Sequence, residues 1–431
     1  MTTVQPAAAA ADAAERPAAA PRGRLWIVSE LYYPEETSTG YVMTALAESL
    51  AAHYPVSVLC GQPTYSARGL RAPSVETRRG VVIRRCSGLT LNKDILAFRL
   101  ANLATLTLSV LLHSLKDVGR NDLVIVVTNP PALPFLMLAA CRVKGARCVL
   151  LIHDVYPDAP IAAGLLRPRG VVARVWARAT AFLYRHVSHI CVIGRDMAAL
   201  VATKMGAVHH PPVTIIANWA EETVLRPVAP GPNALLRELG LLDKFVVQYC
   251  GNLGRVHDIE SLVEAARVLR ESDPDVHFVF IGAGAKKAWL MSEIERIGLD
   301  NLTVLPPKPR SEEDVFLRGC DVAIMAMVPG MAGVGVPSRL YNIMAAGKPV
   351  IAAVDERSEP AIVIQEERIG WVIAPGDPAG IVAAIRSARA DRARLREMSV
   401  RAAMGAQEKY TLADATAAYC RLVERVWSAA Y

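Results

Sequence analysis

Short apolar runs alternate with longer stretches of mixed polar and apolar residues along almost the whole chain. In the first half these runs lie at residues 25–29, 56–60, 81–85, 123–127, 148–152, 190–193 and 213–217. In the second half they lie at residues 245–249, 277–281, 303–305, 322–325, 350–353 and 371–374. Short, nearly continuous apolar runs are typical of strands buried on both faces of a parallel sheet, and the stretches between them have helical patterns. The pattern therefore predicts an α/β protein.

A stretch rich in proline and glycine, residues 226–236, separates the two series of predicted strands. Two consecutive strand–helix series joined by a linker predict two doubly wound, Rossmann-like domains that face each other across a cleft. We place an N-terminal domain at residues 24–220, a linker at 221–240 and a C-terminal domain at 241–407. Ligands of such sheets bind at the carboxyl ends of the strands, so the residues that follow each strand are the candidates for the functional site.

Composition narrows the class of protein. The 431 residues are 52% hydrophobic and 6% aromatic, which suits a soluble α/β protein with two full cores. The net charge of +7 is compatible with phosphorylated substrates or an anionic membrane face. The eight cysteines are scattered without a CxxC pair, so the sequence suggests neither a zinc site nor a disulfide framework and fits a reducing cytoplasm. No motif for binding nucleic acid is present, and residues 1–23, rich in alanine and proline, are predicted to be a disordered lead-in rather than a signal peptide.

One apolar segment is a candidate for contact with a membrane. Residues 100–115 are apolar for most of their length but are short for a membrane span, and Lys116 follows them. This segment predicts either a core helix or a helix that lies on a membrane surface. The charge-free run at residues 123–141 is interrupted by the sequence TNPPALP, which predicts a strand, a loop and a helix in place of a span.

The most informative segment is VGVPSRLYNIMAAGKPVIAA, residues 334–353. It predicts a glycine-rich loop, a short helix that starts near Pro337 and Ser338, and a buried strand, with Gly347 just after the helix. The N-terminus of that helix, with Arg339 in its first turn, would direct hydrogen-bond donors at a ligand over the loop, as in sites for diphosphates. The alternative is a tight turn with a solvated arginine.

Two further loops follow strands of the second series. In CGNLGRVHD, residues 250–258, Gly254 allows close approach of the backbone, and Arg255 and His257 can reach an anion. The alternative here is a plain strand–helix turn. In IGAGAKK, Gly282 belongs to half of a dinucleotide fingerprint, but no clear acidic residue follows at the expected distance, so NAD binding is disfavoured.

Two loops of the first series also carry candidate chemistry. His153 and Asp154 end a predicted strand, where a histidine can donate to a substrate hydroxyl or act as an acid or base. The alternative for His153 is a structural histidine bonded to a neighbouring backbone carbonyl. In the loop YYPEETSTG, Gly40 suits close approach by a ligand, whereas Glu35 and Glu36 are expected to be solvated.

The chain resembles a family-4 glycosyltransferase of the GT-B fold in the order of its motifs, which are SELYYPEETSTG, VTNPPALP, HDVYPDAP, YCGNLGRVHDIESLVEAARVL, FIGAGAKK and GVPSRLYNIMAAGKPVIA. Within that family it is similar to bacterial enzymes of the colanic-acid and O-antigen type, including the fucosamine transferase type. The resemblance covers roughly residues 24–431 and is much less specific for the sugar than for the superfamily. It implies that the last helix, within residues 408–431, packs back on the N-terminal domain.

The resemblance also implies a nucleotide sugar bound mainly by the C-terminal domain, and it assigns three groups of residues. The donor phosphates would lie near Gly40, Gly254, Arg255, His257 and Arg339. The nucleoside and its ribose would lie near Gly282, Pro307, Lys308 and Asn342. The catalytic residues near the transferred sugar would be His153 and Asp154.

The chain departs from the family pattern around the phosphate site. The pattern has two glutamates eight positions apart, but Ala332 or a neighbour stands at the first position and Asn342 at the second, where the family residue often contacts the ribose. Asn342 can still hydrogen-bond a hydroxyl, without charge assistance. The usual arginine and lysine of the phosphate site are replaced by Asn252 and His257, so the remaining arginines would carry more of the phosphate charge.

The predicted activity is transfer of a hexosyl or N-acetylhexosaminyl unit from a nucleotide diphosphate sugar to a growing, lipid-linked cell-surface polysaccharide or exopolysaccharide. UDP-sugars are favoured as donors, and GDP-sugars are allowed. The family chemistry retains the anomeric configuration. The prediction invokes no cofactor and no metal, because no acidic DxD-type cluster lies in the predicted cleft. The expected location is the cytoplasm, with peripheral association with the inner face of the cell membrane.

Two alternatives stay open at this point. The first is a nucleotide-sugar epimerase of the same fold, which would release a changed sugar nucleotide without an acceptor. The second is a catalytically impaired subunit that binds a nucleotide sugar, and it is motivated by the missing glutamates.

Overall fold

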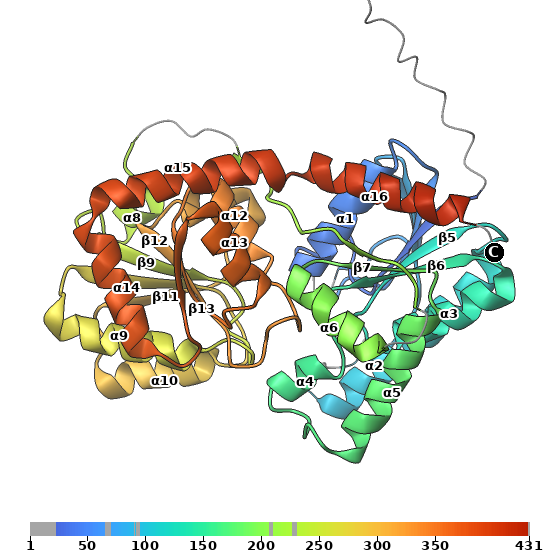
Figure 1. Cartoon of the computed structure of the whole chain (residues 1–431), viewed down its shortest axis with the longest axis horizontal. Coiled ribbons are helices and arrows are strands. Elements are labelled where there is room, and N and C mark those ends of the chain that lie inside the picture. Colours follow the sequence, from blue (N-terminus) through green and yellow to red (C-terminus); the bar gives the residue numbers. More distant parts are fainter. Residues whose placement is uncertain are drawn as a thin grey trace, which may run out of the picture.

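A computed structural model describes residues 23–64, 70–89, 91, 95–206, 210–225 and 231–429, and shows two sheets flanked by helices (Figure 1). Within these residues the N-terminal sheet has eight strands in the order β3-β4-β2-β1-β5-β6-β7-β8, and the C-terminal sheet has six in the order β11-β10-β9-β12-β13-β14. The prediction of two Rossmann-like α/β domains is confirmed. Residues 1–22 of the predicted lead-in and 226–230 of the predicted linker lie outside the described residues.

The N-terminal sheet consists of β1 (Leu25–Val28), β2 (Val56–Cys60), β3 (Val75–Arg78), β4 (Val81–Arg85), β5 (Leu123–Val127), β6 (Arg147–Ile152), β7 (His189–Val192) and β8 (Val213–Ile215). Its central strands β1, β2 and β5 are buried at every residue, because helices cover both faces of a parallel sheet. The edge strand β3 was not predicted, because its sequence VETR lacks an apolar run and pairs antiparallel with β4 at half-exposed positions.

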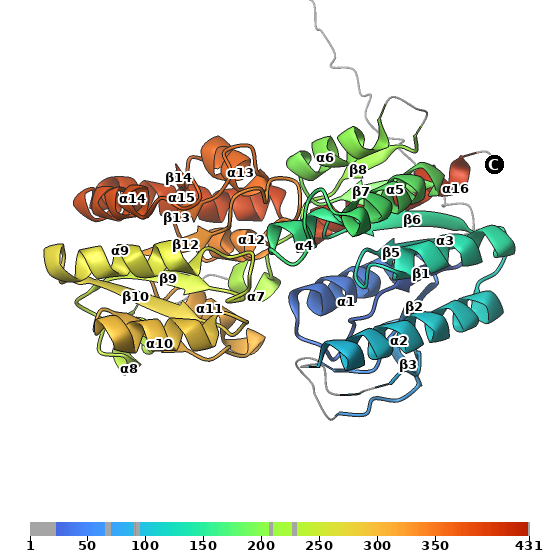
Figure 2. The ribbon, with the colours of Figure 1, turned by 90° about the horizontal axis from the view of Figure 1, so that it is seen from below.

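The helices of the N-terminal domain are α1 (Ser38–Leu50), α2 (Leu96–Asp117), α3 (Leu133–Lys144), α4 (Asp158–Ala162), α5 (Val171–His186) and α6 (Arg195–Met205). Figure 2 shows α2, α3 and α5 along the same side of this domain. None of the helices in the described ranges combines the length and the apolar character that crossing a bilayer requires.

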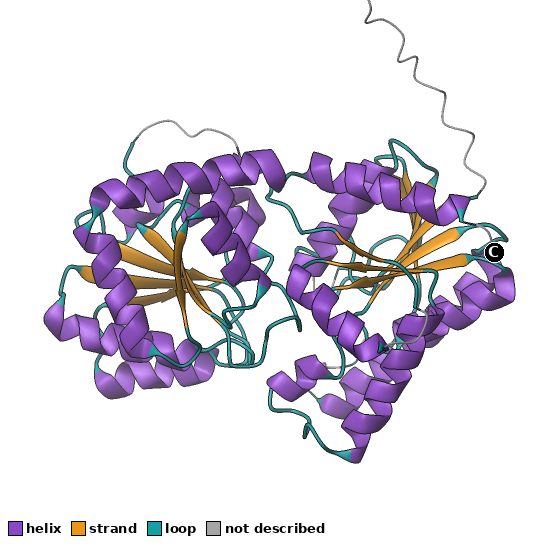
Figure 3. Ribbon diagram, in the orientation of Figure 1, coloured by secondary structure: helices purple, strands orange, loops and turns teal. Residues whose placement is uncertain are grey.

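The C-terminal sheet consists of β9 (Phe245–Cys250), β10 (Val276–Ile281), β11 (Leu302–Leu305), β12 (Val322–Ala326), β13 (Val350–Ala353) and β14 (Gly370–Ile373). All of its neighbouring strands run parallel (Figure 3). Its helices are α8 (Ala234–Glu238), α9 (Ile259–Ser272), α10 (Lys287–Ile297), η1 (Arg310–Glu312), α11 (Glu313–Leu317), α12 (Arg339–Ala345), α13 (Glu359–Glu367), α14 (Pro378–Ala390) and α15 (Arg392–Lys409).

Within the described residues, two segments of the chain connect the domains. The first passage follows β8 and leads through α7 (Glu222–Leu225), and the second joins α15 to α16 (Leu412–Ser428). The amide of Ala220 donates to the carbonyl of Tyr410 at 2.8 Å, so the two passages are hydrogen-bonded to each other. Figure 1 shows α15 over the C-terminal domain and α16 over the N-terminal domain, where Tyr419 and Val423 join the core.

Candidate active site

His153 and Asp154 lie directly after β6, and Thr128 at the end of β5 fixes their backbone. The hydroxyl of Thr128 accepts hydrogen bonds from both amides at 3.2 Å. Nε2 of His153 is buried and has no hydrogen-bond partner among the described residues. Burial lowers the pKa of His153 to about 4, so its imidazole is neutral at physiological pH. A buried, unsatisfied ring nitrogen next to a domain boundary is suited to a ligand hydroxyl.

Asp154 touches the C-terminal domain. Its backbone forms an isolated antiparallel bridge with Gly335, and the amide of Val155 donates to the carbonyl of Val334 at 2.9 Å. A Cβ atom on Gly335 would lie 3.2 Å from Oδ1 of Asp154, so the glycine lets the two domains meet closely. Burial raises the pKa of the Asp154 carboxyl to about 6. The two predicted catalytic residues thus lie against the glycine-rich loop.

That loop leads into α12, which begins at Arg339 and ends before Gly347, as predicted. Gly347 has a φ of +65°, which ends the helix in the left-handed region that favours glycine. Over the loop, the amide of Gly333 donates to Oδ2 of Asp196 at 2.7 Å, and a Cβ atom on Gly333 would lie 2.7 Å from the Asp196 carbonyl oxygen. Aspartates of the N-terminal domain thus lie against two glycines of this loop, and the ligand that we predict over it stays a prediction.

A second polar contact joins the domains beside that loop. The guanidinium of Arg195 donates through Nε and Nη2 to Glu359 at 3.0 Å and through Nη1 to Glu366 at 2.7 Å. Oδ2 of Asp196 also accepts from the amide of Glu359 at 3.0 Å. These residues were missed by the sequence analysis, although Arg195 and Asp196 follow β7 and Glu359 follows β13. They satisfy the rule that functional residues follow the carboxyl ends of the strands.

Arg339 is held from within the C-terminal domain. Its guanidinium forms an ion pair with the carboxylate of Glu313, whose side chain is fully buried, while 28% of the Arg339 side chain stays exposed. The neighbouring Arg310 forms an ion pair with Glu221 and lies 3.7 Å from Glu313. The assignment of Arg339 to the donor diphosphate stays a prediction.

Asn342, which is predicted to lie at the ribose, is buried against two carboxylates, and its contact with the ribose stays a prediction. Its side chain is buried, its Oδ1 accepts from the amide of Glu221 at 3.0 Å, and its Nδ2 donates to Glu221 at 3.3 Å and to Glu313 at 3.1 Å. The physical reason is that two buried carboxylates need donors, and the amide supplies them. Neither carboxylate was singled out from the sequence, because acidic residues in a stretch such as SEED usually lie on the surface.

Arg310 also connects the domains. Its Nε donates to the carbonyl of Glu36 at 2.9 Å, and its guanidinium lies 4.2 Å from the centre of the Tyr41 ring. Nearby, the hydroxyls of Ser38 and Ser338 are hydrogen-bonded at 2.7 Å, which brings the start of α1 next to the start of α12. The N-terminal domain therefore contacts the segments on both sides of the predicted diphosphate site.

The loop after β9 places its two predicted phosphate ligands differently. Arg255 is exposed, so its guanidinium is accessible to an anion. His257 is partly buried, and its Nδ1 has no hydrogen-bond partner among the described residues. Burial, together with the charge of Lys286, lowers the pKa of His257 to about 4, so at neutral pH it offers a hydrogen bond but no positive charge. A Cβ atom on Gly254 would lie 3.2 Å from that Nδ1, so the glycine makes room for the imidazole.

The predicted nucleoside residues lie at the ends of β10 and β11. A Cβ atom on Gly282 would lie 1.9 Å from the carbonyl oxygen of Gly251, so this glycine is required for packing between two strand-end loops, independently of any ligand. Pro307 is exposed, and Lys308 lies 3.4 Å from Glu312. Their contact with a nucleoside stays a prediction.

The loop before α1 also differs from its prediction. Glu35 is buried and accepts a hydrogen bond from the amide of Thr64, so the expectation that it is solvated is wrong, whereas Glu36 is exposed. Gly40 donates its amide to Thr37, the N-cap of α1, and a Cβ atom on it would lie 2.6 Å from the Glu35 carbonyl oxygen. The tight turn accounts for this glycine, and its place at the donor phosphates stays a prediction.

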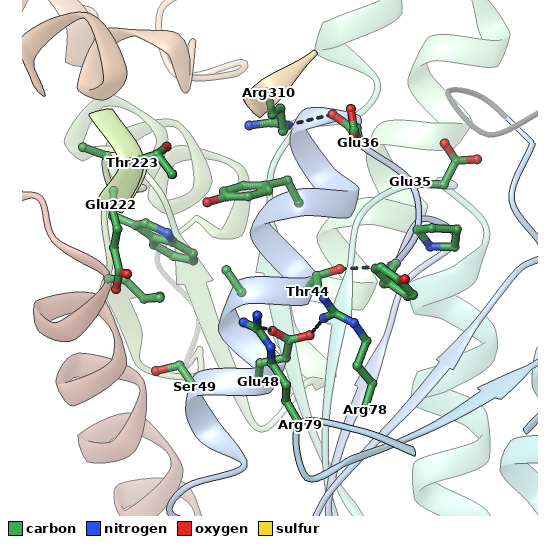
Figure 4. A pocket seen from close by; sticks show the side chains of 17 residues that line it. Glu35, Glu36, Thr44, Glu48, Ser49, Arg78, Arg79, Glu222, Thr223 and Arg310 are labelled. Carbon is green, nitrogen blue, oxygen red and sulfur yellow. Dashed lines mark hydrogen bonds and ion pairs between the residues drawn. The ribbon is translucent and has the colours of Figure 1, made fainter. Parts of the chain in front are cut away.

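A cavity of about 740 Å³ lies next to α1, between the β3 edge and the first passage between the domains (Figure 4). Glu48 forms ion pairs with Arg78 and Arg79 along one wall, and Arg310 and Glu36 meet at its upper end. The rings of Tyr33, Tyr41 and Trp219 line it as well. Aromatic faces beside carboxylates and guanidiniums suit a polar organic ligand such as a saccharide. Among the described residues, no group of three or more His, Cys, Asp or Glu is placed to hold a metal ion.

Two models of known protein families each match about one half of the chain. A model described as "Glycosyl transferase 4-like domain" matches residues 39–219, and a model described as "Glycosyl transferases group 1" matches residues 235–405.

Two relatives extend over most of the chain. One, of Pseudomonas aeruginosa, is named as a probable glycosyltransferase, WbjE, and is 29% identical over 83% of this chain and 87% of the relative. The other, of Escherichia coli (strain K12), carries the name "Putative colanic acid biosynthesis glycosyl transferase WcaI" and is 28% identical over 83% of this chain and 90% of the relative.

Solved structures share the fold at low sequence identity. Sucrose-phosphate synthase of Thermosynechococcus elongatus superposes with a TM-score of 0.76 at 15% identity, covering 95% of this chain and all of that structure. HepE of Anabaena, crystallised with UDP-glucose, superposes with a TM-score of 0.71 at 14% identity, covering 94% of this chain and all of that structure.

Proposed function

Because the chain belongs to the family-4 glycosyltransferases of the GT-B fold, we propose that it moves a hexosyl or N-acetylhexosaminyl unit from a nucleoside diphosphate sugar to a saccharide acceptor. It is a glycosyltransferase of the polysaccharide-biosynthesis type. A UDP-sugar is the favoured donor, and this is supported by the UDP-glucose bound to the structural neighbour HepE. One observation carries the proposal: the bridge between Asp154 and Gly335, which sets His153 and Asp154 beside the loop that leads to Arg339.

In the proposed site, the donor diphosphate lies at Arg339 and Arg255, the two guanidiniums of the predicted phosphate set that keep exposed area. His257 adds a hydrogen bond as a neutral imidazole. The donor sugar then lies towards the N-terminal domain, where Nε2 of His153 bonds one of its hydroxyls and the Asp154 carboxylate accepts from another. The nucleoside lies towards Gly282, Pro307 and Lys308.

The proposed reaction retains the anomeric configuration. The bond between the anomeric carbon and the leaving phosphate oxygen breaks, the acceptor oxygen attacks the same face of that carbon, and the acceptor proton passes to the leaving diphosphate. Arg339 and Arg255 stabilise the charge that develops on the diphosphate, so catalysis is mainly positioning and electrostatic stabilisation.

The proposed acceptor is a saccharide on a lipid carrier, with its sugar part in the cavity next to α1. The lipid part would lie at the membrane, and the surface over α2 and α5 supports this. On α2, the side chains of Leu108 and Leu112 are 54% and 59% exposed. On α5, Val172 is 61% exposed, and residues 167–185 contain five arginines and no acidic residue. Apolar side chains among cations suit an anionic lipid surface at the inner face of the cell membrane.

The test of the function is binding followed by product analysis. Calorimetry against UDP, GDP and ADP identifies the donor class, and incubation of the matching sugar nucleotides with lipid extracts identifies the acceptor. Transfer of sugar to the extract, with release of the nucleoside diphosphate, is the expected result. Conversion of the sugar nucleotide without an acceptor would favour an epimerase, and binding without turnover would favour an impaired binding subunit.

A further inference from the structure

Two guanidiniums, two carboxylates and one amide meet next to the start of α12, and the carboxylates and the amide are buried. They come from four segments of the chain: the first passage between the domains, η1, α11 and α12. Arg310 pairs with Glu221 and lies 3.7 Å from Glu313, and Arg339 pairs with Glu313. Asn342 donates to both carboxylates. We call these five residues the Arg–Glu network.

The network is balanced in charge and poorly solvated. None of the Glu313 side chain and only 5% of the Glu221 side chain is exposed, so each carboxylate depends on its partners. The charges of its two guanidiniums and two carboxylates sum to zero. Asn342 fits between them because its amide supplies two donors and one acceptor without adding charge. A carboxylate at this position would be a third anion and could donate nothing.

The network has one accessible member on the side of the proposed diphosphate site. The Arg339 side chain is 28% exposed, whereas the carboxylate that holds it is fully buried. A guanidinium that is already fixed loses less freedom when an anion binds, so the anion binds more tightly.

We propose that Glu313 is the positioning residue for Arg339, and that the neutral amide of Asn342 is what allows a buried carboxylate at residue 313. This inference rests on the proposed function, because it takes the ligand of Arg339 to be the donor diphosphate. Glu313 touches neither donor nor acceptor and acts only through Arg339.

The charge balance is tested by thermal unfolding of four variants that keep the side-chain shapes. Glu313→Gln removes one anion and Asn342→Asp adds one, and each is expected to lower Tm by about 5 °C or more. The double variant returns the network to two anions and is expected to regain at least half of that loss. Asp314→Asn removes a charge from the next residue of α11 and is the matched control, with Tm within about 2 °C of the wild type. The proposal would be overturned if Asn342→Asp kept the Tm of the wild type. It would also be overturned if the Tm of the double variant fell by the sum of the two single losses.

The positioning role is tested by calorimetry with UDP, and with GDP or ADP if UDP does not bind. Glu313→Gln is expected to raise the Kd about tenfold, the double variant to bind no better because it also lacks the carboxylate at residue 313, and Asp314→Asn to bind unchanged. Tighter binding by Glu313→Gln would overturn the role, because it would show that Glu313 competes with the diphosphate for Arg339. If no nucleoside diphosphate binds the wild type, the proposed function and this positioning role are both wrong. The charge balance is tested separately, by the unfolding temperatures alone.

Discussion

Asp154 of the N-terminal domain forms a backbone bridge with Gly335 of the C-terminal domain. This pairing sets a carboxylate and the imidazole of His153 directly against the loop that starts α12. Gly335 leaves room for this close approach, since a Cβ atom there would lie 3.2 Å from the Asp154 carboxylate. The bridge therefore fixes the distance between the predicted catalytic residues and the predicted diphosphate site.

Asp154→Asn is expected to stabilise the protein at high pH while reducing its activity. The pKa of the carboxyl is about 6 in the folded protein, above its ordinary 3.8, because burial disfavours the charge. The carboxyl therefore favours folding fully only below its unfolded pKa, and this contribution is lost as pH rises through about 6. Asparagine mimics the protonated form, so the variant should gain a few degrees in Tm at pH 8, show little change at pH 4.5, and lose about tenfold or more in turnover.

Thermal unfolding at the two pH values, with turnover measured at pH 8, checks this prediction. Asp300→Asn, in the loop before β11, controls for the loss of a negative charge in general. A Tm gain that is equal at pH 4.5 and pH 8 would show that the buried charge is not its cause.

Gly333→Ala is expected to weaken the contact between the domains. Gly333 has a φ of +74°, and a Cβ atom on it would lie 2.7 Å from the carbonyl oxygen of Asp196. Gly330 is a matched control, because its φ is +84° but a Cβ atom there would meet nothing within 4 Å. Both variants introduce backbone strain of about 1–2 kcal/mol, and only Gly333→Ala adds the clash. We expect Gly333→Ala to lower both Tm and kcat/KM well below the values for Gly330→Ala, and equal values for the two variants would contradict the role of this contact.

Arg339→Ala is expected to lower turnover by about 100-fold or more, because it removes a donor that stabilises the leaving diphosphate. Arg339→Lys should restore little, since a lysine lacks the planar fork that binds Glu313 and a phosphate together. Arg267→Ala, on the exposed side of α9, is the control for loss of a guanidinium. Turnover is measured with the donor identified by calorimetry, and near wild-type turnover in Arg339→Ala would remove Arg339 from the phosphate site.

The fold was predictable because burial on both faces gives parallel strands an uninterrupted apolar sequence. The runs at residues 81–85, 123–127 and 350–353 match β4, β5 and β13 at both ends. The strand β3 was not predicted, because it is stabilised by pairing with β4 at the edge of the sheet, and its own sequence has no apolar pattern. The helix α1 begins at Ser38, where Thr37 caps it.

The site was predictable only to the level of strand ends. The rule that ligands gather at the carboxyl ends of strands led to His153, Asp154 and Arg339. It could not show that Asn342 turns inward, because that depends on carboxylates 29 and 121 residues away in the sequence. For the same reason, Glu313 was not recognisable as a buried residue. Contacts of this kind are properties of the tertiary structure rather than of a motif.

Leu108→Glu and Leu112→Glu on α2, and Val172→Glu on α5, are each expected to release the protein from anionic membranes. These side chains are more than half exposed, so a glutamate there removes apolar contact and adds repulsion from anionic lipid without disturbing the core. Leu106 is a poorer choice, although the apolar pattern of residues 100–115 also includes it, because it packs against the core of the N-terminal domain. Flotation with vesicles of phosphatidylglycerol and phosphatidylethanolamine measures the effect, with a loss of at least about fivefold in the bound fraction expected at 0.1 M salt.

The arginines near α5 also predict that binding to the vesicles depends on the salt concentration. Because the arginines near α5 would contribute through unscreened attraction, binding of the wild type should fall as salt rises from 0.1 M to about 0.5 M, where the screening distance is about halved. Val400→Glu is the matched control, since Val400 is 58% exposed on α15 but belongs to the other domain. If Val400→Glu releases the protein as strongly as Leu108→Glu, the bound surface is not the one over α2 and α5. If the wild type does not float with the vesicles at all, the membrane-facing role of that surface is wrong, and the acceptor must reach the cavity next to α1 from solution.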